Sequence, residues 1–170
     1  MPSFRRSRLF ALVTAALALA ACGDDDGSPE PERFTAQLAG SNEVPPVTTS
    51  ASGTATFTAL GDTAIGYSID VAALTGVTMG HIHVGAAGVN GPVVVWLLPP
   101  DGTAPQSPSG NITGTLSTGR IRASSIRGIA GAPPISLDSL RRLLRSGTTY
   151  VNLHTQLNPG GELRGQIVRR

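Results

Sequence analysis

Short apolar or alternating runs, each ended by glycine, proline, asparagine or aspartate, make up the chain from Arg33 onward. Runs of this length and pattern are typical of β-strands. The 21 glycines and 13 prolines of the 170-residue chain supply the turns between them. We expect about eight strands, over residues 34–38, 53–60, 63–70, 79–84, 92–98, 111–117, 150–156 and 162–168. Because the strands do not alternate with helices, the pattern predicts an all-β fold and not a parallel α/β sheet.

Two of these runs define local structure more closely. Gly61 and Asp62 separate two alternating runs and predict a hairpin between residues 53–60 and 63–70. Residues 93–98 are continuously apolar, as expected for a strand that is buried on both faces. We therefore place this strand at the centre of the fold and expect Trp96 to be mostly buried.

One segment has the period of a helix. Its apolar positions are Leu137, Leu140 and Leu144. Ser136 can cap the first turn, Asp138 suits the positive end of the helix dipole, and Gly147 fits the end of the helix. The arginines that lie off the apolar stripe, and that we expect to face solvent, are Arg141, Arg142 and Arg145.

The strands and the single helix together predict one domain over residues 33–168. We expect an all-β, Greek-key β-sandwich, immunoglobulin-like or superoxide-dismutase-like, with one short helix.

The first 22 residues have the pattern of an export signal. Arg5, Arg6 and Arg8 precede an apolar run, Leu9–Ala21, that is shorter than the roughly 20 residues of a membrane-spanning helix. The run ends in Leu-Ala-Ala before Cys22, which resembles a bacterial lipobox. A short membrane anchor, or an ordinary signal with an incidental cysteine, are the alternatives.

We predict a lipoprotein signal peptide over residues 1–21 and lipidation of Cys22, the only cysteine of the chain. Several acyl chains on one cysteine would attach the protein stably to a membrane. Residues 22–32 are acidic, contain no bulky apolar side chain and are expected to form a tether. The domain would then lie in the periplasm or on the cell surface, anchored to a bacterial membrane, the outer one if the cell has two.

The charge balance argues against nucleic-acid binding. Removal of the three signal-peptide arginines turns the formal net charge of +2 slightly negative, and aromatic residues make up only 4% of the chain. Stacking platforms for bases are therefore scarce. The remaining arginines are concentrated after residue 119, but we expect them to mix with acidic groups in one fold.

Three blocks of sequence resemble the CHRD domain, the module named for its occurrence in chordin. They cover residues Phe34–Phe57, Gly80–Val93 and Tyr150–Ile167, and they occur in the family's order and spacing. The resemblance implies a β-sandwich module that is secreted or attached to a surface. The cysteine-rich modules that accompany it in chordin have no counterpart here, so growth-factor antagonism is not implied.

The three histidines of the chain lie inside these blocks, at His81, His83 and His154. Residues two apart in a strand point to the same face, so His81 and His83 share a side and Ile82 faces the core. If the closing hairpin lies beside this strand, three imidazoles converge on an exposed face. Three nitrogen ligands with an open position suit copper or zinc. The alternative is that the histidines pair with polar neighbours and bind nothing.

The His-x-His pair is also similar to the metal-binding histidines of copper–zinc superoxide dismutase, another exported sandwich. That enzyme uses more histidines and a zinc-binding aspartate, so a full dinuclear centre cannot be built here. Among the acidic residues, Glu43 is a candidate loop anchor. Glu162 and Arg164 could orient a histidine ligand or form a cross-strand ion pair.

Three functions therefore remain open. We favour a non-enzymatic binding or adhesion module at the cell envelope, with an unknown protein or envelope ligand as its partner. The second is an envelope protein that binds copper or zinc through the three histidines. The third is a small redox enzyme built on the same site.

Overall fold

The computed structural model describes residues 30–99 and 110–170. The strands are β1 (Arg33–Ala39), β2 (Ser52–Leu60), β3 (Ala64–Thr75), β4 (Val77–Val84), β5 (Val93–Leu98), β6 (Asn111–Ile121), β7 (Thr149–Thr155), β8 (Leu163–Gln166) and β9 (Val168–Arg169). The helix is α1 (Leu137–Arg145), and single 3₁₀ turns lie at η1 (Gly40–Asn42), η2 (Ala123–Ser125) and η3 (Ile129–Gly131). The expected signal peptide and Cys22 lie outside the described residues, as do residues 100–109 of the loop after β5.

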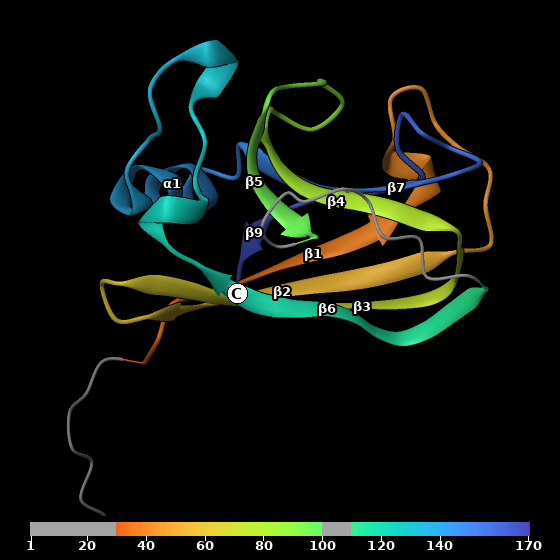
Figure 1. The fold of residues 1–170 in the computed structure, drawn as a ribbon, viewed down its shortest axis with the longest axis horizontal. Coiled ribbons are helices and arrows are strands. Elements are labelled where there is room, and N and C mark those ends of the chain that lie inside the picture. Colours follow the sequence, from red (N-terminus) through yellow and green to blue (C-terminus); the bar gives the residue numbers. More distant parts are fainter. Residues whose placement is uncertain (1–29, 100–109) are drawn as a thin grey trace, which may run out of the picture.

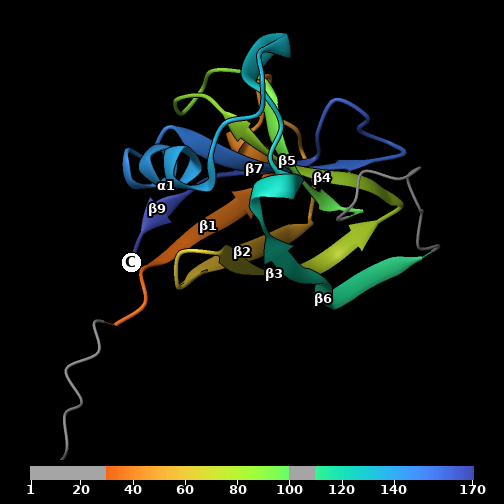
Figure 2. The same ribbon diagram turned by 60° about the vertical axis from the view of Figure 1, so that its left-hand side comes forward.

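The strands pair antiparallel in the order β5-β4-β7-β8-β1-β2-β3-β6, and β9 pairs with β1. Figure 1 and Figure 2 show that this sheet folds into two facing layers, with β5, β4 and β7 in one and β1, β2, β3 and β6 in the other. Only the Ala39–Arg164 pair joins β1 to β8, so the layers separate there. The predicted all-β fold with one short helix is confirmed.

The hydrophobic core fills the space between the layers. Ile82 and Val151 enter it from one layer, and Phe57 and Ile69 enter it from the other, each with an exposed fraction of at most 1%. The chain crosses between the layers at Gly76, where a φ of +63° suits glycine and lets β3 continue directly into β4. The strand with the histidines therefore starts immediately at the layer boundary.

Strand β5 lies at one end of the sheet order, so the prediction of a central position is wrong. Val94, Val95 and Leu97 are buried, and Trp96 is mostly buried, as predicted. The other edge of β5 is covered by an isolated bridge between Val95 and Ile126, by the N–H of Arg127, which donates to the carbonyl of Val94 at 2.8 Å, and by side chains. The hydroxyl groups of Tyr67 on β3 and Ser117 on β6 both donate to the carbonyl oxygen of Leu97, each at 2.9 Å.

The predicted hairpin between β2 and β3 is confirmed, with β3 running on to Thr75. The predicted last strand is divided by Ile167 into β8, which pairs with β7, and β9, which pairs with β1. Ile167 is fully buried at this division and donates its N–H to the carbonyl of Thr149. The C-terminal segment thus pairs with one strand of each layer.

Helix α1 lies beside β9 (Figure 2) and begins as the sequence predicts. The side chain of Ser136 accepts the N–H of Ser139, and the leucine stripe is buried. The expectation that Arg141 faces solvent is wrong. Its guanidinium is buried and donates to Asp62 at 3.3 Å and to the carbonyl of Gly61, because the long side chain reaches back to the β2–β3 turn.

The other two arginines of α1 lie at the surface. Arg142 pairs with Asp138 one turn earlier, and Arg145 donates to both carboxylate oxygens of Glu32. Glu32, at the end of the expected tether, is therefore held against the helix. No helix within residues 30–99 and 110–170 has the length and apolar character needed to cross a membrane.

Candidate metal centre

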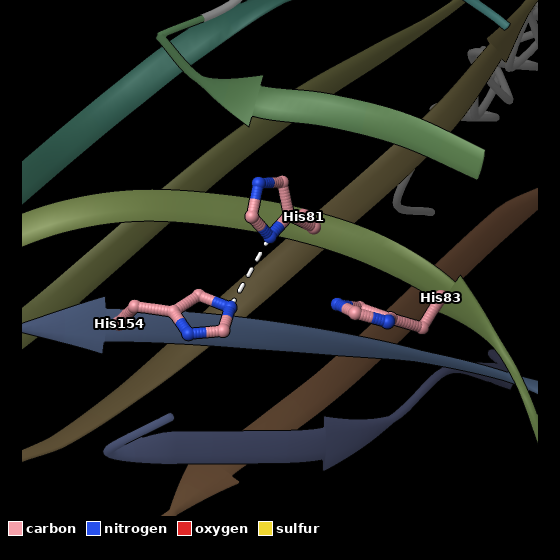
Figure 3. Close-up of side chains that lie close together, drawn as sticks. All are labelled: His81, His83 and His154. Atoms are coloured by element: carbon pink, nitrogen blue, oxygen red, sulfur yellow. Dashed lines mark hydrogen bonds between the residues drawn. The ribbon is translucent and has the colours of Figure 1, made fainter. Parts of the chain in front are cut away.

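Strands β4 and β7 bring the three histidines together. His81 and His83 lie on β4, and His154 lies on β7, where it is opposite Met79. Each histidine offers one ring nitrogen that lies within 4.8 Å of the nitrogens offered by the other two. Figure 3 shows the rings of His83 and His154 directed toward each other, with His81 beside them. The predicted convergence on one face of neighbouring strands is confirmed.

The expectation that this face is exposed is wrong. His81 has an exposed fraction of 4% and His154 of 8%, and His83 is half-buried. The site lies on the side of the sheet away from the core, but segments outside the strands close over it. The carbonyls of Gly91 and Pro159, which come from two separate loops, both bond to histidine rings.

Those two carbonyls also orient the rings. Nδ1 of His83 lies 2.8 Å from the carbonyl oxygen of Gly91, and Nδ1 of His154 lies 2.9 Å from that of Pro159. Because a carbonyl only accepts, both Nδ1 atoms carry the proton. The Nε2 atoms of His83 and His154 therefore carry the lone pairs. This is the arrangement by which metal-binding histidines are usually oriented.

His81 completes the cluster. Its Nδ1 lies 3.2 Å from Nε2 of His154 (Figure 3). Two nitrogens bound at 2.0–2.1 Å to one tetrahedral ion are about 3.3–3.4 Å apart, so this spacing suits a shared ion. It also suits a hydrogen bond from a protonated Nδ1. The remaining separations, up to 4.8 Å, require small side-chain movements before all three nitrogens can reach one ion.

The environment keeps the imidazoles neutral. Burial, together with the nearby His154 and His83 rings, lowers the pKa of His81 to about 3. Burial also lowers the pKa of His83 and of His154, although their carbonyl partners oppose the shift. Nε2 of His81 and Nε2 of His83 are buried without a hydrogen-bond partner among the described residues. Neutral imidazole is the form that binds a metal.

Aromatic rings contact two of the three histidines. The ring of Trp96 meets His81 edge-to-face, with centroids 4.2 Å apart, and the ring of Tyr150 stacks on His83 at 4.8 Å. The Tyr150 hydroxyl also accepts the N–H of Gly91, whose carbonyl holds His83. Along β7 the side chains alternate between the core and the opposite face of the sheet. Tyr150 lies on that opposite face, together with the histidines.

The other candidate residues hold loops. Glu43 is buried and accepts a hydrogen bond from the amide of Asn152, so its predicted anchoring role is confirmed. Burial raises the pKa of Glu43. Arg164 is 2% exposed and donates to Asn90 and to the carbonyls of Ala86 and Val89. It thereby fixes the loop that ends at Gly91.

Glu162 accepts from the hydroxyls of Thr49 and Thr155 and from the amide of Asn158. Burial opposes its ionisation, but these three donors together lower its pKa. The structure pairs it with neither Arg164 nor a histidine among the described residues. The suggested ion pair is therefore absent among the described residues, and of the two only Arg164 acts on a histidine, indirectly, by fixing the loop whose Gly91 carbonyl holds His83.

Comparison with known protein families gives a match. The family model of the CHRD domain matches residues 34–167, which extend from β1 to the residue before β9 and contain all three histidines. No curated protein and no solved structure matches the chain. The chain belongs to the CHRD domain family.

Proposed function

We propose that this CHRD domain binds one copper or zinc ion through Nδ1 of His81, Nε2 of His83 and Nε2 of His154. The observation that carries the proposal is the pair of backbone carbonyls that hold Nδ1 of His83 and His154. They leave two Nε2 lone pairs within reach of a common point. Copper and zinc both accept imidazole nitrogen.

The alternative, that the histidines serve only to pack the loops, leaves part of the arrangement unexplained. Nε2 of His83 is buried without a partner among the described residues, and an unpaired buried polar atom costs about 1–3 kcal/mol. A bound ion would satisfy it. Three protein ligands also leave a fourth coordination position for water or a further ligand. The proposed function is binding, and chemistry at that fourth position is not part of it.

We also propose that the domain works at the cell envelope of a bacterium, attached by a lipid on Cys22. The support is the sequence alone: the arginines at the start, the apolar run and the lipobox-like residues before Cys22. Replacing Cys22 by Ser should move the protein from the membrane fraction to the soluble fraction, or block its processing. Recovery of the unaltered protein as a soluble chain with a free thiol would contradict this part of the proposal.

Metal analysis tests the binding proposal. Purified residues 23–170 should take up one equivalent of zinc or copper with a dissociation constant below about 1 µM, measured by calorimetry and elemental analysis after dialysis. Single replacements His81→Gln, His83→Gln and His154→Gln should each abolish stoichiometric uptake. Asp70→Asn, which alters an exposed carboxylate on β3 in the other layer, is the matched control and should bind as the parent does. If none of the proteins binds either metal, the interaction-module function remains.

A further inference from the structure

A chain of contacts connects His81 with a cation. The ring of Trp96 contacts His81 edge-to-face, and the guanidinium carbon of Arg127 lies 5.8 Å from the Trp96 ring centroid. Arg127 is exposed and, with Trp96, lines a surface hollow of about 540 Å³. The positive charge of Arg127 is close enough to lower the pKa of His81.

A second chain of the same kind connects His83 with Arg164. The ring of Tyr150 stacks on His83, with an angle of 10° between the rings, and the guanidinium carbon of Arg164 lies 3.6 Å from the Tyr150 centroid. Arg164 is almost fully buried and is held by Asn90 and by two loop carbonyls. Its charge is therefore fixed in position and weakly screened.

The candidate ligands themselves bring no negative charge. Within the described residues, no aspartate, glutamate or cysteine joins the three histidines in the cluster. The buried carboxylate of Glu43 interacts with the charge of Arg164, but it bonds to Asn152 and not to a histidine. An ion at this site would be surrounded by neutral donors and flanked by two arginines.

We infer that the site selects monovalent copper, Cu(I), over the divalent ions Cu(II) and Zn(II), an inference that rests on the proposed metal-binding function. The desolvation penalty of an ion in a buried site grows steeply with its charge. Each arginine repels a divalent ion twice as strongly as a monovalent one. Imidazole is a suitable ligand for copper and for zinc. The ligand type therefore does not separate these ions, and the lower charge of Cu(I) decides which of them is bound most tightly.

The test compares affinities for single metals on the full-length chain in detergent. Cu(I) is titrated without oxygen, with ascorbate present and bicinchoninate as the competing chelator. Cu(II) and Zn(II) are titrated against chelators of known affinity. The inference predicts that Cu(I) is bound more tightly than either divalent ion. Tighter binding of Cu(II) or Zn(II) than of Cu(I) overturns it and leaves the proposed function intact, whereas binding of no metal overturns both.

Replacing Arg127 tests the effect of its charge on the metal preference. Arg127→Gln should raise the affinity for Zn(II) relative to Cu(I) by about three- to tenfold, and Arg127→Glu should raise it further. Arg127 is exposed, so both replacements leave the core unchanged. Arg120→Gln on β6 removes the same charge from an exposed position without a recorded aromatic contact and is the control. An unchanged ratio in both Arg127 variants overturns the inference.

Discussion

Nδ1 of His81 and Nε2 of His154 lie 3.2 Å apart across the β4–β7 strand pair. The two residues are 73 positions apart in the chain, and the strand register alone brings them into contact. His83 is placed beside them by the same register, and the loop carbonyls of Gly91 and Pro159 then select which nitrogens face inward.

Tyr150 should position His83 mainly through its ring. Tyr150→Leu removes the ring that stacks on His83, and we expect metal affinity to fall about tenfold, within the range for residues that orient a ligand. Tyr150→Phe keeps the ring and loses only the hydroxyl that accepts the N–H of Gly91, so its affinity should fall less. Calorimetric titration with zinc checks both variants. Equal losses in the two variants would contradict a role for the stacked ring.

The metal-free protein should lose stability on acidification. The pKa of each histidine is lower in the folded chain than in the unfolded chain, where it is near 6.5. The unfolded state therefore binds more protons below about pH 6.5, and the free energy of unfolding falls as pH decreases from there toward about 3, the pKa of His81. Urea denaturation with a chelator present, at pH 7.5 and pH 5, measures the loss.

His81→Gln provides the comparison for this pH dependence. It removes the histidine with the largest stated pKa shift and keeps Glu43, whose pKa is raised by burial and whose effect on stability has the opposite sign. The variant should lose less stability than the parent between pH 7.5 and pH 5. A parent protein equally stable at both values would show that the histidines are not held neutral by the fold.

The sequence predicts the contacts of this site that follow from strand alternation, but not those made by the backbone of the loops. Strand alternation placed His81 and His83 on one face and Ile82 in the core, because side-chain direction in a strand follows from spacing alone. The covering loops were not predicted, because they act through the backbone carbonyls of Gly91 and Pro159. Every residue has a backbone carbonyl, so the sequence does not show which of them bond to histidines.

In the fold as a whole, local features were predicted correctly and contacts between distant parts of the chain were not. The leucine period and the Ser136 cap define α1 locally, and both were predicted correctly. Arg141 was misplaced because its partners, Gly61 and Asp62, lie about eighty positions away and only the fold brings them near. Strand β5 was wrongly placed at the centre because an apolar run does not show whether its strand has a neighbour on each side. Long-range pairing decides both cases.

The hydroxyl groups of Tyr67 and Ser117, which both donate to the carbonyl of Leu97, should stabilise the fold cooperatively. Tyr67→Phe and Ser117→Ala each leave the Leu97 carbonyl with one hydroxyl partner, so each should lower the free energy of unfolding by about 1 kcal/mol. The double variant leaves a buried carbonyl unpaired, and its loss should exceed the sum of the single losses. Chemical denaturation of all four proteins completes the cycle. Strict additivity would mean that the two bonds are independent.

Arg141 should contribute more to stability than its neighbour on α1. Arg141→Met removes donors to Asp62 and to the Gly61 carbonyl at a buried position, and we expect a loss of about 1–3 kcal/mol in the free energy of unfolding. Arg142→Met, at an exposed position with one ion pair, should change stability by less than about 0.5 kcal/mol. Similar effects in a denaturation experiment would place Arg141 in solvent after all.

If His81, His83 and His154 bind one ion together, X-ray absorption spectroscopy of the protein loaded with one equivalent of zinc or copper will show it. We expect three imidazole nitrogens in the first coordination shell, about 2.0–2.1 Å from zinc. Any metal that the His154→Gln variant retains should have one imidazole fewer. A shell without imidazole, or the same shell in the parent and in all three His→Gln variants, would contradict this shared site.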